Sequence, residues 1–324
     1  MTGHEDGRRT TVAAAVQLES RLGDVTGNLA AGERLANEAG DRGAEWILLP
    51  EFFTTGMGWN KQMADAALRP DGPATELLLR VASRYGAKVG GSFLCEDDDG
   101  HVRNAFFLAT PDGIVGRHDK DIPTQWENFW YVGGSDDGVM DVDGLTVGAA
   151  LCLELGRTRT VERLRGVDLV VGGSFTWHYP SYWPRVLGRA HLERKYGQDY
   201  VRWAPPFARL VGAPVVEATH CGRLEGIDPT MRIPYRSLVG GGTRICAADG
   251  TVLAERSHLD GPGVVVAEVT VGSVPPLDEP PDRAYLVPRG AIWSTMWAIQ
   301  RLQGRRAYAR RRVSDPGSPG RGAR

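Results

Sequence analysis

The segment Trp46-Ile47-Leu48-Leu49-Pro50-Glu51-Phe52-Phe53 indicates both the fold and one functional position. Its first four residues form a continuous apolar run that ends at a proline, a pattern typical of short strands buried on both faces. Glu51 follows this strand directly and stands between apolar residues, so we expect its carboxyl group to be poorly solvated. Desolvation raises the pKa of a carboxyl group toward the range useful for proton transfer. A strand-end glutamate pointing into water is the alternative, and this segment alone favours that alternative.

Strands and helices alternate on both sides of this segment. Short apolar runs predict strands, and apolar residues spaced by three and four predict helices. The turn residues 110–113 and 249–250 predict two hairpins. Alternating βα units beside hairpins indicate an α/β fold with mixed sheets covered by helices. The predicted strands are 11–18, 46–49, 87–94, 104–109, 114–118, 145–153, 168–171, 214–219, 244–248, 251–254 and 264–269, and the predicted helices are 28–42, 75–85, 158–165 and 291–302.

The composition excludes several classes of function. The formal net charge of −2 over 324 residues gives no global basic field, so we expect no nucleic-acid partner. The first ten residues lack the apolar core of a secretory signal, and no apolar stretch is long enough to span a bilayer. These features predict a cytoplasmic protein without a membrane partner. The four cysteines and seven histidines have no zinc-ligand spacing, which predicts reduced thiols and no metal site.

The domain organisation follows from where apolar residues are available for burial. We expect a flexible N-terminus over 1–10, one large domain over 11–275, a C-terminal extension with a helix over 276–303, and a disordered basic tail over 304–324. The helix offers Trp293, Met296 and Trp297 for packing on the body or on a second subunit. A basic arm that binds an acidic partner is the alternative to a solvated tail.

The segment Gly116-Arg117-His118-Asp119-Lys120-Asp121-Ile122-Pro123 provides a second functional candidate, Lys120. A lysine after a hairpin strand is usually only a surface charge. Here, aromatic residues follow it and surround Glu127, and aromatic walls around a few polar groups are typical of pockets. An aromatic mini-core under a loop is the alternative. The aromatic residues are Trp126, Phe129, Trp130 and Tyr131.

Cys152 is the third candidate, in Val147-Gly148-Ala149-Ala150-Leu151-Cys152-Leu153-Glu154. A free cysteine within an apolar strand is usually an inert core residue. Cys152, however, stands where the strand ends and a helix is expected to begin near Arg157. A thiol close to a helix N-terminus and a lysine ionises more readily. Cys95 is the nearest rival, but the acidic residues 96–99 that follow it disfavour a thiolate.

Taken together, these three motifs resemble the signature regions of the nitrilase superfamily, the carbon–nitrogen hydrolases. The resemblance covers roughly residues 11–271, with further agreement at 172–177, 208–216 and 241–253. It implies a four-layer αββα sandwich of two mixed β-sheets covered by helices. It also implies a catalytic triad of Glu51, Lys120 and Cys152, a second glutamate at Glu127, and a homodimer or higher homo-oligomer.

The resemblance further implies a mechanism without a cofactor. Cys152 would attack an amide carbonyl or a nitrile carbon, with Glu51 as general base and then acid. Lys120 and the backbone N–H of Leu153 would stabilise the oxyanion. We expect the substrate pocket to include Phe53, Trp126, Trp177 and His178, although a packed or surface position for this histidine is an equal alternative.

Two departures from the family pattern leave the branch open. Nitrilases usually have Cys-Trp-Glu where this chain has Cys152-Leu153-Glu154, and many amidases have Cys-Tyr-Asp followed by Arg-Phe-Pro, whereas no Phe-Pro follows Arg157. We favour an amidase that cleaves a non-peptide C–N bond through a thioester, releasing ammonia or an amine and a carboxylic acid. A nitrilase, an N-carbamoyl amidase, an acyltransferase and a catalytically inactive binding module are the alternatives.

Overall fold

The apolar runs of the sequence form strands in the computed structural model, which describes residues 9–177, 202–287 and 290–314. Most predicted elements lie within a few residues of their expected bounds. The short strand β6 and the hairpin β10–β11 were not predicted. The strands are β1 (Arg9–Leu18), β2 (Trp46–Leu48), β3 (Lys88–Glu96), β4 (Val102–Thr110), β5 (Gly113–Asp119), β6 (Val139–Val142), β7 (Leu145–Leu151), β8 (Leu169–Ser174), β9 (Val215–His220), β10 (Arg223–Ile227), β11 (Pro234–Leu238), β12 (Thr243–Cys246), β13 (Val252–Arg256) and β14 (Gly263–Val271). The helices are α1 (Val25–Asp41), α2 (Pro73–Tyr85), α3 (Thr158–Leu164), α5 (Ala204–Val211) and α6 (Ala291–Ser314), with short 3-10 turns that include η2 (Gln125–Phe129) and η3 (Cys152–Gly156).

The strands form one mixed sheet that folds over into two halves. The order is β5-β4-β3-β2-β1-β9-β8-β7-β6, with β14 paired to β1 and with β12 joining β9 to β13. The two halves meet where β1 pairs with β9, and this pairing involves only the last two residues of β1, Gln17 and Leu18. Because the link is so short, the halves can splay apart and stack face to face. Strands β10 and β11 form a separate hairpin.

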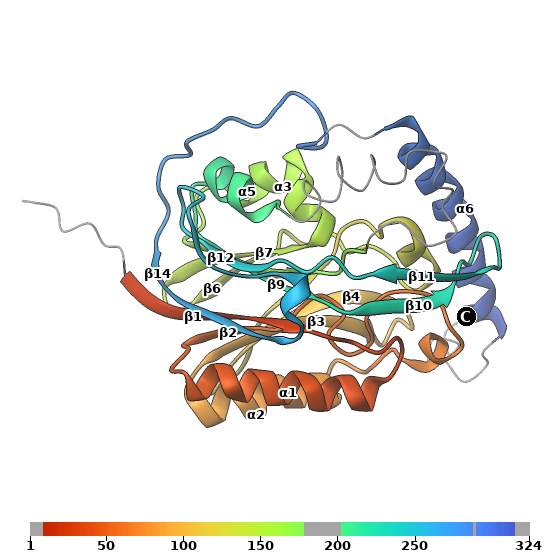
Figure 1. Ribbon diagram of the computed structural model, residues 1–324, viewed down its shortest axis with the longest axis horizontal. Helices are drawn as coiled ribbons and strands as arrows, with labels where there is room; N and C mark the ends of the chain where they lie inside the picture. Colours follow the sequence, from red (N-terminus) through yellow and green to blue (C-terminus); the bar gives the residue numbers. More distant parts are fainter. Residues whose placement is uncertain (1–8, 178–201, 288–289, 315–324) are drawn as a thin grey trace, which may run out of the picture.

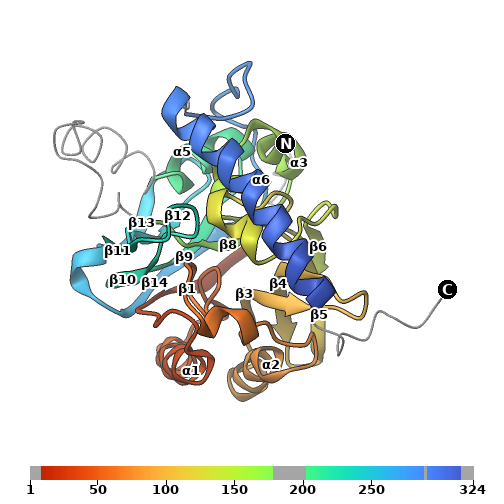
Figure 2. The same ribbon diagram turned by 90° about the vertical axis from the view of Figure 1, so that its right-hand side faces the viewer.

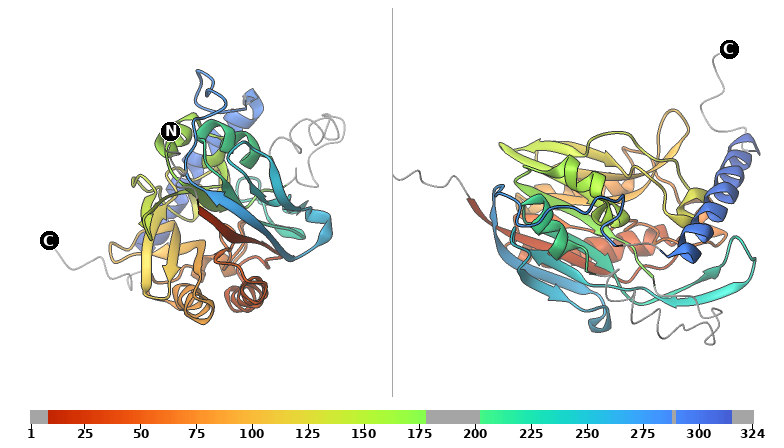
Figure 3. Two further views of the ribbon diagram at one scale, coloured as in Figure 1. Left: turned by 90° about the vertical axis from the view of Figure 1, so that its left-hand side faces the viewer. Right: turned by 90° about the horizontal axis from the view of Figure 1, so that it is seen from above.

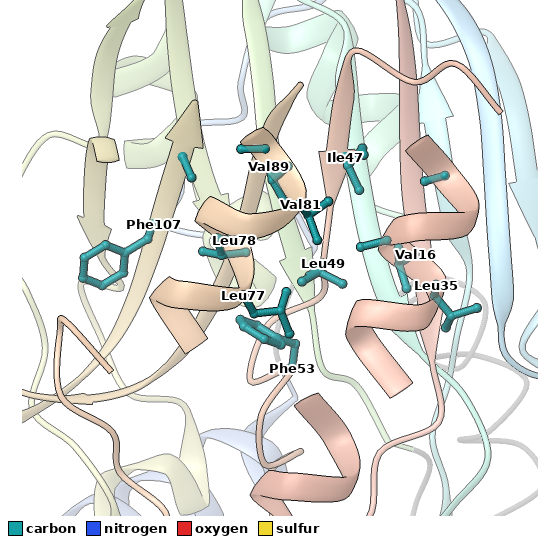
Figure 4. Close-up of a cluster of buried hydrophobic side chains, with 14 of the residues drawn as sticks. Val16, Leu35, Ile47, Leu49, Phe53, Leu77, Leu78, Val81, Val89 and Phe107 are labelled. Atoms are coloured by element: carbon teal, nitrogen blue, oxygen red, sulfur yellow. The ribbon is translucent and has the colours of Figure 1, made fainter. Parts of the chain in front are cut away.

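Alternating side chains along each strand build three separate cores. In β1, Ala13 and Ala15 face the other half of the sheet, whereas Ala14 and Val16 face α1 and α2. The strands of the second half also bury both faces. One face contributes to the core between the two sheet halves, and the other contributes to the core under α3 and α5. This alternation is the period-two pattern of strands buried on both faces. The outer core beneath α1 and α2, drawn in Figure 4, includes Leu77 and Phe53.

The result is the predicted four-layer arrangement, with the sheet halves between two helical layers (Figure 1). Helices α1 and α2 cover one half, and α3 and α5 cover the other, as the end view in Figure 3 also shows. Within the described part of the chain, no helix has the length and apolar character needed to cross a membrane.

Helix α6 corrects the prediction of a disordered tail that begins at residue 304. The helix runs from Ala291 to Ser314 and lies diagonally across one end of the sheets (Figure 2). Three contacts explain why this arginine-rich stretch is ordered. Gly304 lies against η2, Tyr308 accepts a hydrogen bond from the backbone N–H of Val102 at 2.9 Å, and the Arg311 guanidinium lies 4.4 Å from the ring centroid of Trp130. Buried aromatic and glycine contacts, which composition alone does not reveal, therefore hold the helix.

Candidate active site

Glu51 lies at the turn that follows β2, completely buried. The next residue, Phe52, has a positive φ of 54°, a conformation that costs a non-glycine residue energy and often marks functional turns. Strand β8 approaches this turn so closely that a Cβ on Gly173 would lie 2.5 Å from the Glu51 backbone nitrogen. The absence of a side chain at Gly173 therefore lets β8 pack directly against the Glu51 turn.

Lys120 follows β5 and points its buried ammonium group at two carboxylates. Its Nζ lies 2.8 Å from Glu51 Oε1, and 3.0 and 2.9 Å from the two carboxylate oxygens of Glu127. Burial would lower the pKa of Lys120, but the two carboxylates outweigh this effect and raise its pKa well above the usual value. Lys120 is therefore a permanent cation, and the alternative of a surface lysine is wrong.

Glu127 lies on η2 and is held from three sides. Besides binding Lys120, its Oε2 accepts a hydrogen bond from the Thr124 backbone N–H at 2.7 Å and another from the Tyr131 hydroxyl. The glutamate and its neighbours are buried. The aromatic segment 126–131 therefore provides both the position of Glu127 and its shielding from water.

Cys152 stands at the turn between β7 and η3 with a positive φ of 50°. Its Sγ lies 3.8 Å from the Phe175 carbonyl oxygen, and the Phe175 N–H donates to Glu51 Oε2 at 2.9 Å. The charges of Glu51, Lys120 and Glu127 all act on the thiol. Three distant stretches of chain thus bring one thiol, one ammonium and two carboxyl groups together at the ends of β2, β5 and β7.

The buried carboxyl group of Glu51 has a pKa of about 7, well above the ordinary value. Desolvation is the largest cause, and the Lys120 ammonium opposes it. The negative charge of Glu127 adds to the rise, because one lysine serves two carboxylates. A carboxyl group with this pKa can accept and return a proton near neutral pH, which suits a general acid–base.

The position of Cys152 near a lysine predicted a thiol that ionises more readily than usual. The structure shows the opposite. Burial and the charge of Glu51 raise its pKa well above the usual value, and Lys120 lowers it only in part. The expectation was wrong because the thiol is buried and because two carboxylates compensate the ammonium charge. The resting group is therefore a neutral thiol that needs a base before it can act as a nucleophile.

The residues expected to line a pocket lie in different places. Phe53 lies in the outer core, with its ring 6.2 Å from that of Phe93, so its assignment to the pocket is wrong. The turn at Phe52 sends the two neighbouring rings to opposite sides, and Phe52 is the one beside Lys120. Trp126 and Trp177 stack at 5.3 Å in the aromatic cluster next to η2. His178 lies outside the described residues.

Sequence reasoning missed three groups that hold Glu51. Asn104 Nδ2 donates to Glu51 Oε1 at 2.9 Å, and the backbone of Phe175 binds the other oxygen. His220 donates from Nε2 to the Glu51 carbonyl oxygen at 2.6 Å and stays neutral because burial lowers its pKa to about 4. The available signal was a polar residue near the start of one apolar strand, at position 104, and another at the end of a second, at position 220. In the described ranges, no group of three or more His, Cys, Asp or Glu side chains is arranged to hold a metal ion.

Comparison with known proteins gives consistent matches. The Carbon-nitrogen hydrolase family model matches residues 12–277. A nitrilase of Pyrococcus abyssi is 27% identical over 194 residues, which is 56% of this chain and 71% of that protein. The omega-amidase NIT2-B of Xenopus laevis is 28% identical over 178 residues, which is 51% of this chain and 62% of that protein.

A solved structure has the same fold. It is a mutant of the amidase from Nesterenkonia sp. AN1 with acrylamide added at its active-site cysteine. It superposes with a TM-score of 0.59 at 19% identity, covering 79% of this chain and 92% of that one. The family model spans most of the chain, and all four layers of the fold lie within the matched residues. The chain therefore belongs to the carbon–nitrogen hydrolase family, within the nitrilase superfamily.

Proposed function

We propose that the protein hydrolyses the non-peptide C–N bond of a small amide through a thioester on Cys152. The observation that carries this proposal is the completely buried carboxyl group of Glu51, whose Oε1 lies 2.8 Å from the Lys120 ammonium. It shares the Lys120 ammonium with a second carboxylate and is joined to the thiol through the backbone of Phe175. An inert scaffold has no need of this costly arrangement of buried charges.

In the first half of the reaction, ionised Glu51 takes the thiol proton while Cys152 Sγ bonds to the amide carbon. The carbonyl oxygen becomes an oxyanion, and the Lys120 ammonium stabilises it. The N–H of Leu153 is the second donor, since it lies in the first turn of η3, where amide groups have no intrahelical acceptor. The oxyanion then re-forms the carbonyl as the C–N bond breaks. Protonated Glu51 gives its proton to the departing nitrogen, which leaves ammonia or an amine and a thioester.

In the second half, Glu51 takes a proton from a water molecule as the water oxygen bonds to the thioester carbon. The same donors stabilise the second oxyanion. Its collapse breaks the C–S bond, and the sulfur recovers a proton from Glu51. The products are a carboxylic acid and the resting thiol, so atoms and charge balance over the cycle.

The relatives support amides and nitriles as the substrates to test. The matched proteins include a nitrilase and an omega-amidase, and the structural neighbour is an amidase. We favour the amide because one matched relative is an omega-amidase and the structural neighbour is an amidase. A nitrile would form a thioimidate at the same sulfur, and an N-carbamoyl amide or acyl transfer would also use the thiol. The expected homodimer and the cytoplasmic location stay predictions.

The test is ammonia release from a panel of small amides, nitriles and carbamoyl amino acids. We expect turnover of amides and a fall of at least about a thousandfold in Cys152→Ala. Cys221→Ala is the matched control, because Cys221 is also buried but belongs to the β9–β10 connection. Intact mass should reveal an acyl adduct in the parent and none in Cys152→Ala. Unchanged turnover in Cys152→Ala would refute the mechanism, and ammonia from nitriles alone would refute the amide preference.

A further inference from the structure

A further buried carboxylate, that of Glu154, links the segment of Cys152 to the segment of Lys120. Glu154 Oε2 accepts a hydrogen bond at 2.8 Å from the N–H of Leu151, the residue before Cys152. Its Oε1 accepts another at 3.1 Å from the N–H of Asp121, the residue after Lys120. One carboxylate thus binds the backbone on both sides of the site without touching the reacting groups.

The side chain of His118 contacts the Glu154 carboxylate and balances its charge. The completely buried imidazole places Nε2 2.9 Å from Glu154 Oε2 and Nδ1 2.5 Å from Asp136 Oδ1. An imidazole between two carboxylates can donate to both only when it carries both protons, as the imidazolium. Asp136 also accepts from the Asp119 N–H at 2.9 Å, so the second carboxylate holds the same strand end as Lys120.

The turn at Cys152 needs such a restraint. A non-glycine residue with a φ of 50° is strained, and such strain persists only where the surrounding contacts hold it. The hydrogen bond from the Leu151 N–H to the Glu154 carboxylate spans this turn from the residue before Cys152. Loss of the charge balance behind Glu154 would therefore loosen the turn and separate the thiol from the ammonium.

We propose that Glu154, His118 and Asp136 act as a positioning group that sets Cys152 against Lys120, and that deprotonation of His118 releases it. The inference rests on the proposed function, because positioning matters only if the thiol and the ammonium act on one substrate. It adds to the reaction three residues that contact neither the sulfur nor the lysine side chain.

The release should occur in the alkaline range. Burial lowers the pKa of His118, but the facing carboxylates of Glu154 and Asp136 outweigh it and raise the pKa to about 9. The Arg163 guanidinium on α3, which lies 4.0 Å from Glu154 Oε2, acts in the opposite direction. The imidazolium is thus present at neutral pH and lost as the pH rises through about 9.

Two substitutions test positioning by their effect on rate. Glu154→Leu should lower kcat about 10- to 100-fold with little change in KM, because misplacement by about 1 Å costs roughly that factor. Glu154→Gln keeps an acceptor oxygen for the backbone and should recover part of the loss. His258→Asn, in the β13–β14 connection, is the control that replaces a histidine away from the site.

The pH profile of kcat separates positioning from simple destabilisation. Asp136 is one third exposed, so Asp136→Asn should fold, and it should move the alkaline limb from about 9 toward neutral pH. His118→Asn should remove this limb and lower kcat at all pH values. Wild-type profiles and kcat in both variants would overturn the proposal. If these profiles persist while Cys152→Ala is inactive, only the positioning inference fails; an active Cys152→Ala would instead defeat the proposed function.

Discussion

Asn104→Leu should move the acid limb of the pH profile to higher pH without abolishing activity. The Asn104 amide donates a hydrogen bond of 2.9 Å to Glu51 Oε1, the oxygen that also faces Lys120. This bond stabilises the ionised carboxylate, which is the form that takes the proton of Cys152. Leucine has a similar volume and no donor, so the change removes the bond and preserves the packing.

The size of the effect follows from the burial of both groups. A hydrogen bond to a charged group contributes about 1.5–3 kcal/mol, and one pH unit corresponds to about 1.4 kcal/mol. In the parent, the limb should have its midpoint near pH 7, where the pKa of Glu51 lies. Asn104→Leu should therefore move the midpoint by about one to two pH units, to between about 8 and 9.

The assay is kcat/KM for an amide from pH 5 to 10 at constant ionic strength. At pH 5, the parent should retain roughly one hundredth of its plateau value, because that fraction of Glu51 is ionised. Asn37→Ala on α1, remote from the site, should leave the profile unchanged. An unmoved midpoint in Asn104→Leu would refute the reasoning that Glu51 is the base and that the hydrogen bond from Asn104 stabilises its ionised form. So would a parent profile that is flat from pH 5 to 8.

Three further predictions follow from contacts of single residues. Glu127→Gln should lower the midpoint of the acid limb, since the charge of Glu127 raises the pKa of Glu51; a pH profile of kcat/KM checks this, and an upward shift would contradict it. Gly304→Val should lower the free energy of unfolding by about 1–3 kcal/mol in urea titrations, because the added Cβ would lie 2.7 Å from Asn128 Cβ. The control, Ala309→Val on the exposed face of α6, should leave the free energy of unfolding unchanged. The pKa of His118 in the folded protein is about 9, above its usual 6.5. Its contribution to the free energy of unfolding is therefore complete below about pH 6.5 and should disappear as the pH rises through 9. Equal stability of the parent and His118→Asn at pH 7 would contradict this.

The layer structure could be predicted because each strand carries its own signal. Runs such as Trp46–Leu48 and Leu169–Ser174 are apolar on both faces, and only a sheet covered on both sides accommodates that pattern. The strand ends then placed Glu51, Lys120 and Cys152 in equivalent positions. Their convergence rested on resemblance to a family, since no local pattern shows which strand ends meet in space.

Other features could not be predicted because they depend on contacts between distant residues. The direction of the Phe53 side chain depended on the backbone conformation of Phe52, which the sequence does not encode in any simple way. The order of α6 beyond residue 304 depended on a glycine that fits against η2 and on an arginine over Trp130. The protonation of Cys152 depended on the burial of the thiol and on the number of carboxylates around Lys120, both of which only the fold determines.

Two buried glutamates on neighbouring turns show why one can act as a base and the other as a permanent anion. Among the described residues, Glu51 faces one cation, Lys120, and shares it with the completely buried Glu127, so part of the cost of its burial remains and its pKa rises. Glu154 faces both His118 and Arg163, and it also accepts bonds from two backbone N–H groups, so its pKa falls well below the usual range. Asp136 competes with Glu154 for the positive charge of His118. Because Asp136 is partly exposed, water also stabilises its carboxylate. Burial alone would raise the pKa of both glutamates. The number of facing cations and backbone N–H donors decides the difference, so Glu51 can transfer protons and Glu154 stays ionised and holds the backbone in place.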